Sequence, residues 1–153
     1  MRKRARSVVR LPGAVAAAAA LVLFSVQAIA AGKLVIEQAW IRTAPPTALM
    51  LAGYATLRND GDATLTVSGA DSADFSDVQL HQTVLEGGVE LMRPTGRFEI
   101  APGKSVPFGP GGKHFMLVRP KRALAAGARV KIHISTTDGG GATAEFVVRD
   151  DAP

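Results

Sequence analysis

The chain has 153 residues, no cysteine, one tryptophan and one tyrosine, and 18 Lys and Arg against 13 Asp and Glu. Five of the basic residues and none of the acidic ones lie in residues 1–30, so residues 31–153 carry 13 of each and are formally neutral. The missing thiol excludes disulfides, thiol redox chemistry, iron–sulfur clusters, a blue-copper centre and a lipoprotein anchor, and the neutral balance gives no support to nucleic-acid binding.

Residues 1–30 have the order of a secretory signal peptide. A basic segment, 2–10, precedes an apolar, alanine-rich segment, 11–27, and Ala28-Ile29-Ala30 supplies small residues for cleavage. A retained membrane anchor is the competing interpretation, but the apolar run is shorter than the roughly 20 residues that span a bilayer. We therefore expect cleavage before Ala31, a periplasmic protein and no membrane anchor.

Short β-type runs separated by Gly, Pro, Asn and Asp fill residues 31–153, which are numerous enough for one domain with its own core. The first run begins at Leu34 and stops at Pro45-Pro46. Asn59-Asp60-Gly61 predicts a hairpin between 54–57 and 64–67, and Glu86-Gly87-Gly88 predicts a second. The remaining predicted strands are 78–84, 89–92, 98–100, 105–108, 114–118, 130–135 and 143–148.

Nine or ten short strands without a long helical period predict an all-β fold, an antiparallel Greek-key β-sandwich. Alternation supports this prediction, since Val130, Ile132 and Ile134 would face one side of a strand and Lys131 and His133 the other. His133 is therefore expected at the surface.

No pattern predicts catalysis. The chain has neither a G-x-S-x-G elbow nor an H-E-x-x-H helix, and nothing marks a nucleophile. Asp71, Asp74 and Asp77 do not follow the spacing of a calcium loop and are interpreted as solvated turn residues. We expect a binding protein rather than an enzyme.

Histidine and methionine form the most informative pattern. His81 is followed after ten residues by Met92, after twenty-one more by His114, and after one more by Met116. Any one of these residues alone is more often a core or surface residue than a ligand, but all four at this spacing favour a common site. Met50, after Pro45-Pro46, is a weaker candidate for a place beside that site.

Strand rules allow the four side chains to meet. A two-residue turn at Glu86-Gly87 would place His81 opposite Met92, whereas a turn at Gly87-Gly88 would make them diagonal neighbours on one face. His114 and Met116 are two residues apart and share a face of their strand. Two soft thioethers with two imidazoles suit Cu(I), one ion per chain, and argue against zinc, calcium and magnesium.

The four residues with their spacing carry a resemblance to a known family, the periplasmic copper chaperones called PCuAC, whose signature is His-x10-Met-x21-His-x-Met. The flanking segments 91–94, 111–117 and 39–42 also resemble the family, so the resemblance covers essentially all of residues 31–153. It implies a cupredoxin-like sandwich in which His81, Met92, His114 and Met116 bind Cu(I). It further implies delivery of copper to the binuclear copper site of a haem–copper oxidase, directly or through a partner copper chaperone.

Two departures from the family limit what is carried over. Gln82 and Thr83 follow His81 where many members have another methionine, and the chain ends in Asp150-Asp151-Ala152-Pro153 rather than a tail rich in histidine and methionine. A second copper site is therefore not expected. Two alternatives stay open: a metal-free exported β-sandwich for adhesion or interaction, and His/Met ligation of a b-type haem. We expect a monomer whose partner is a copper-receiving protein.

Overall fold

The computed structural model describes residues 31–153, and ten β-strands lie within them; the predicted signal peptide, residues 1–30, lies outside the described residues. The strands are β1 (Leu34–Arg42), β2 (Met50–Asn59), β3 (Leu65–Asp71), β4 (Phe75–Glu86), β5 (Val89–Pro94), β6 (Phe98–Ile100), β7 (Ser105–Phe108), β8 (Lys113–Pro120), β9 (Arg129–Thr136) and β10 (Gly141–Arg149). This confirms the all-β prediction. From residue 31 to 153 there is no helix with the length and hydropathy needed to cross a lipid bilayer.

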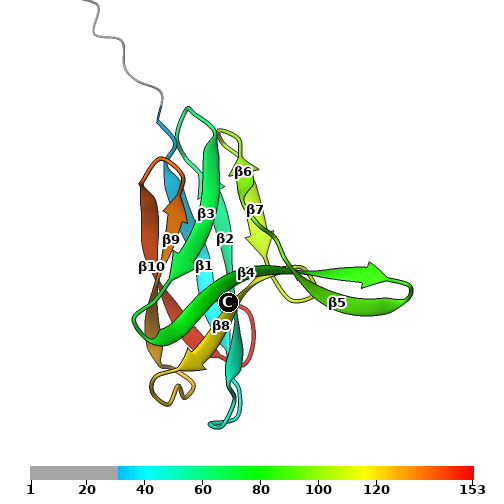
Figure 1. The fold of residues 1–153 in the computed structure, drawn as a ribbon. Helices are drawn as coiled ribbons and strands as arrows, with labels where there is room; N and C mark the ends of the chain where they lie inside the picture. Colours follow the sequence, from blue (N-terminus) through cyan, green and yellow to red (C-terminus); the bar gives the residue numbers. More distant parts are fainter. Residues whose placement is uncertain (1–30) are drawn as a thin grey trace, which may run out of the picture.

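The strands are hydrogen-bonded in the order β5-β4-β8-β7-β2-β1-β10-β9-β3-β6, with β8 also pairing with β2. The two halves of this order face each other across one core, because Leu57 and Phe115 from one half belong to the same buried cluster as Ile132 and Phe146 from the other. Figure 1 shows the resulting sandwich. Most pairings are antiparallel, but β1 with β10 and β7 with β8 run parallel.

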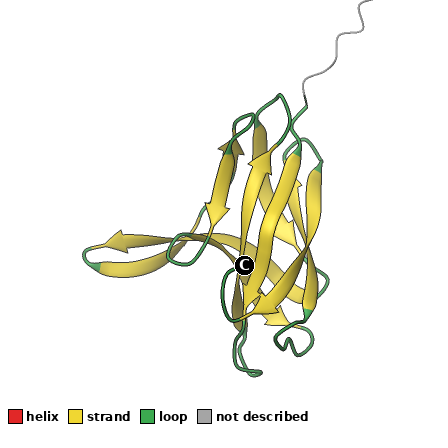
Figure 2. Cartoon of the chain, turned by 180° about the vertical axis from the view of Figure 1, so that it is seen from behind, coloured by secondary structure: helices red, strands yellow, loops and turns green. Residues whose placement is uncertain are grey.

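The β4–β5 hairpin projects from this sandwich as a two-stranded arm (Figures 1 and 2). Its loop is Gly87-Gly88, and both residues have positive φ, 59° and 81°, as a two-residue type I′ turn requires. Glu86 therefore pairs with Val89, and Thr83 pairs with Met92. The second predicted hairpin is confirmed, with the turn that makes His81 and Met92 diagonal neighbours.

The first predicted hairpin, at Asn59-Asp60-Gly61, is wrong. β2 pairs with β1, β7 and β8, whereas β3 pairs with β9 and β6, so this segment crosses between the two halves of the sandwich. Asn59 is fully buried. Its carboxamide accepts hydrogen bonds from the backbone N–H groups of Lys33 and Gly61 and donates to the carbonyls of Ala63 and Ile100. The side chain thus fastens a crossover rather than initiating a hairpin.

Successive side chains of strand β8 point alternately into the core and towards the candidate site. Phe115 and Leu117 are fully buried in the core, where the Phe115 ring stacks on Phe108 at 4.6 Å and meets Phe146 edge-on at 5.6 Å. His114 and Met116 must therefore project from the opposite face. Strand β8 is paired with β4 on one side and with β2 on the other, so His114 and Met116 project from an interior strand of the sheet.

Candidate metal centre

His81 and His114 lie directly opposite each other on β4 and β8. Their ring centroids are 6.0 Å apart, and both residues are buried, with 8% and 6% of their surface exposed. Opposed residues of an antiparallel pair share a face, so both rings lie on the face of the sheet that is turned away from the core. The structure thus brings together the two histidines that the sequence spacing singled out.

The orientation of the His81 ring is set by Gln79 and Asp77. The Gln79 amide nitrogen donates to the Asp77 carboxylate at 2.7 Å, which turns the Gln79 amide oxygen towards His81. That oxygen lies 3.1 Å from His81 Nε2 and can only accept, so Nε2 carries the proton. In the neutral ring, Nδ1 then has a free lone pair.

His114 is oriented by backbone. Its Nδ1 lies 3.1 Å from the carbonyl oxygen of Gly112 and must donate to it, which leaves the lone pair on Nε2. Among residues 31–153, His81 Nδ1 and His114 Nε2 are the two buried side-chain nitrogen or oxygen atoms without a hydrogen-bond partner. Unpaired buried polar atoms are costly and rare. Two such nitrogens on neighbouring rings are the arrangement expected of metal ligands whose other nitrogens are held by protein acceptors.

The environment favours neutral imidazole. Burial, followed by the proximity of His114, lowers the pKa of His81 below its ordinary value. An imidazolium ring must lose its proton before its nitrogen can bind a metal. The lowered pKa therefore keeps the His81 lone pair available near neutral pH.

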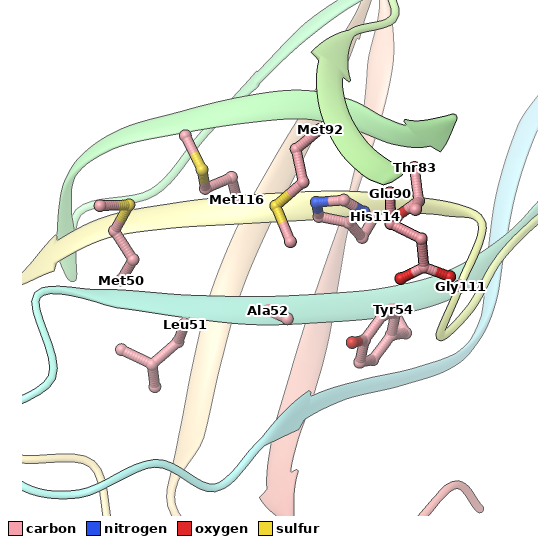
Figure 3. Close-up of a pocket in the computed structure, with 10 residues that line it drawn as sticks. All are labelled: Met50, Leu51, Ala52, Tyr54, Thr83, Glu90, Met92, Gly111, His114 and Met116. Carbon is pink, nitrogen blue, oxygen red and sulfur yellow. The ribbon is translucent and has the colours of Figure 1, made fainter. Parts of the chain in front are cut away.

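The methionines lie around one cavity of about 420 Å³ on this face. Met116 and His114 reach it from β8, Met92 from β5 and Met50 from β2 (Figure 3). Met116 is half-buried, whereas Met92 is 66% exposed and Met50 is 59% exposed. Three thioethers and one imidazole thus gather at a site that solvent can reach.

His81 does not line this cavity. It borders the neighbouring hollow, which is also lined by Gln79, Pro94 and Arg97. His114 lines the cavity with the thioethers and lies opposite His81, so it stands between that cavity and the His81 ring. The two hollows do not form one enclosed space. Imidazole and thioether groups, which are uncharged when neutral, suit a soft monovalent cation better than a hard divalent one.

The other residues considered in the sequence lie elsewhere. His133 is half-buried on β9, and its Nδ1 lies 3.0 Å from the Thr143 hydroxyl. Asp74 pairs with Arg122 at 2.7 Å. Nowhere in the described residues, 31–153, do three or more His, Cys, Asp or Glu side chains group so that they could hold a metal ion.

Residues 34–148 match the model of a protein family described as "Putative lipoprotein LpqE-like". The chain belongs to the LpqE-like family. A curated relative, "Putative lipoprotein Lxx21020" of Leifsonia xyli subsp. xyli (strain CTCB07), is 33% identical over 116 residues, which are 75% of this chain and 69% of the relative.

Solved structures of PCuAC domains share the fold of this LpqE-like chain, which confirms the resemblance found in the sequence. The copper-bound PCuAC domain from PmoF2 is 25% identical with a TM-score of 0.63, over 80% of this chain and 95% of the domain. The Cu(I) form of DR1885 from Deinococcus radiodurans is 27% identical with a TM-score of 0.62, over 81% of this chain and 83% of that protein. The cupredoxin-like fold predicted from the resemblance is likewise confirmed.

The lipoprotein descriptions bear on localisation. They indicate exported proteins, in agreement with the export signal predicted for residues 1–30. They differ in part from the expectation of no membrane anchor, since a lipoprotein is attached through lipid, whereas this chain contains no cysteine. Periplasmic localisation and cleavage before Ala31 stay predictions.

Sequence reasoning missed the residues that orient the histidines. Gln79 lies two residues before His81, so strand periodicity places both side chains on one face, a signal that was present in the sequence. Nothing in the sequence indicated that the Gly112 carbonyl orients His114, because every residue has a backbone carbonyl. Tyr54 and Glu90 also line the cavity, and neither belongs to the His/Met pattern.

Proposed function

We propose that the chain is an exported copper chaperone that binds one Cu(I) and passes it to a copper-receiving protein, either the copper subunit of a haem–copper oxidase or another copper chaperone. His81 Nδ1, His114 Nε2 and the sulfurs of Met92 and Met116 are the proposed ligands. The protein acts by binding and ligand exchange and catalyses no reaction.

One observation carries this proposal: two buried imidazole nitrogens lack partners beside a cavity lined by thioethers. Imidazole and thioether together prefer Cu(I) to hard cations. The copper-bound PmoF2 domain and Cu(I)-DR1885, which share the fold at 25% and 27% identity, add support from outside the chain.

The exposure of the site favours release. Met92 is 66% exposed on a projecting arm, whereas His81 and His114 are buried in the sheet. An incoming ligand from a partner protein can therefore approach the copper from the Met92 side while the imidazoles still bind it. The four proposed ligands are neutral when they bind copper, so Cu(I) can leave them as Cu(I) and none of them has to take up a proton.

Replacing Met92 by leucine tests the thioether. Leucine is close to methionine in volume but cannot bind copper, so we expect the Cu(I) affinity, measured by competition with a chromophoric chelator, to fall about tenfold or more. Val89→Ala is the matched control, because Val89 lies on the opposite face of β5 and is similarly exposed, at 59%. Equal affinities of the Met92→Leu and unchanged proteins would refute the role of Met92.

Thermal unfolding separates this function from a metal-free interaction module. A ligand that binds the native state at a hundred times its Kd adds about 2.7 kcal/mol to the free energy of unfolding. Cu(I) should therefore raise the melting temperature of the purified residues 31–153. A melting temperature that excess Cu(I) leaves unchanged would favour the metal-free module, and a Soret band after haem addition would favour haem binding instead.

A further inference from the structure

We propose that Met50 supplies a third sulfur ligand to the copper ion, on the solvent side of the site. Because Cu(I) takes at most four ligands, Met50 binds in exchange with His81, the one proposed ligand that does not line this cavity. This inference rests on the proposed Cu(I) binding and extends the ligand set beyond the His-x10-Met-x21-His-x-Met pattern. Its starting point is that Met50, Met92 and Met116, all three methionines in residues 31–153, line the same cavity.

The register of β2 against β8 places Met50 within reach of Met116. Ala52 lies opposite Met116, and Met50 lies opposite Val118, so Met50 is the diagonal neighbour of Met116 on the same face. Such neighbours have Cα atoms about 7–8 Å apart, which long side chains can span. Figure 3 shows the side chains of Met50 and Met116 close to each other at one end of the cavity, with Met92 and His114 beyond.

Ala52, which lies beside Met50 on the same face of β2, leaves the cavity open between Met50 and Met116. Ala52 presents only a methyl group to Met116, so no bulky side chain of β2 separates the Met50 sulfur from the cavity. On the other side of β8, Met116 faces Gln79, whose amide is engaged by Asp77 and His81. A further soft ligand for this end of the cavity can therefore come from β2 and not from β4.

Packing does not explain Met50. A methionine usually serves as a gap-filler in a core, but Met50 is 59% exposed and gains little from burial. Its exposed thioether, like that of Met92, faces a cavity rather than the core. Sulfur chemistry accounts for a methionine at this position better than hydrophobic burial does.

Met50→Leu tests the inference, because it keeps the volume and removes the sulfur. We expect the Cu(I) affinity of the purified residues 31–153 to fall about tenfold. X-ray absorption of the copper-loaded protein should report more than two sulfur scatterers per copper in the unchanged protein and two in Met50→Leu. Leu49→Ala is the control, because Leu49 is 67% exposed and lines a different hollow beside Arg119 and Pro120.

An unchanged sulfur count in Met50→Leu would overturn the inference, whether or not the affinity falls, because Met50 would then only shape the cavity. The failure of the proposed function looks different. If the unchanged protein binds no Cu(I), copper binding itself is refuted. If Met92→Leu weakens binding and Met50→Leu alters neither affinity nor sulfur count, the inference about Met50 alone fails.

Discussion

Replacement of His114 by alanine should lower the Cu(I) affinity on the order of a hundredfold or more, the largest effect expected of any single change at the site. His114 is the residue that links the two parts of the site. Its ring lies opposite His81 on β4 and also lines the cavity with Met92 and Met116. Competition with a chromophoric Cu(I) chelator would measure the change.

His133→Ala is the matched control for this experiment. His133 is the third histidine of the chain, lies on β9 and is hydrogen-bonded to Thr143 away from the cavity, so its removal should leave the affinity unchanged. Circular dichroism and thermal unfolding of the metal-free proteins would show that both variants fold. A folded His114→Ala protein that binds Cu(I) like the unchanged protein would contradict the ligand assignment.

Replacement of Asn59 by alanine should lower the free energy of unfolding by about 3 kcal/mol, and it removes none of the proposed copper ligands. The fully buried carboxamide makes hydrogen bonds at 3.1, 2.9, 2.7 and 2.9 Å to the backbone of Lys33, Gly61, Ala63 and Ile100. Alanine would leave these groups unpaired or force water among them, and each unpaired buried group costs about 1–3 kcal/mol. Urea unfolding of the metal-free protein would measure the loss.

Asp60→Ala provides the control for Asn59. Asp60 is the exposed next residue and forms a surface ion pair with Arg58, which is worth little in water. Its replacement should therefore change the free energy of unfolding by less than about 1 kcal/mol. If Asn59→Ala were as stable as Asp60→Ala, the crossover would not depend on the buried carboxamide.

Local sequence patterns were enough to locate the strands. The alternation on β9 is borne out, since Val130, Ile132 and Ile134 are buried and His133 is only half-buried. The hairpin at Glu86-Gly87-Gly88 was predicted for a local reason, because glycine readily adopts the positive φ that such a turn requires. The position of the two-residue turn decides whether Met92 pairs with His81 or with Thr83. The sequence alone left both registers open.

Asn59-Asp60-Gly61 shows where such patterns fail. The same residues that favour a hairpin turn also occur in a crossover, and the choice depends on which strands lie beside β2 and β3. The partners of Asn59 lie as far away in sequence as Ile100, 41 residues along the chain. No local pattern contains that contact.

For the candidate site, the sequence by itself determined which residue types recur at which spacing and which face of its strand each one occupies, because strand periodicity is local. It thereby singled out His81, Met92, His114 and Met116. Only the tertiary structure decided that His81 faces His114, that their unpaired nitrogens are Nδ1 and Nε2, and that Met50 joins Met92 and Met116 at one cavity. These relations depend on the pairing of β8 with both β4 and β2, and strand pairing is set by the burial of the whole core rather than by any short segment.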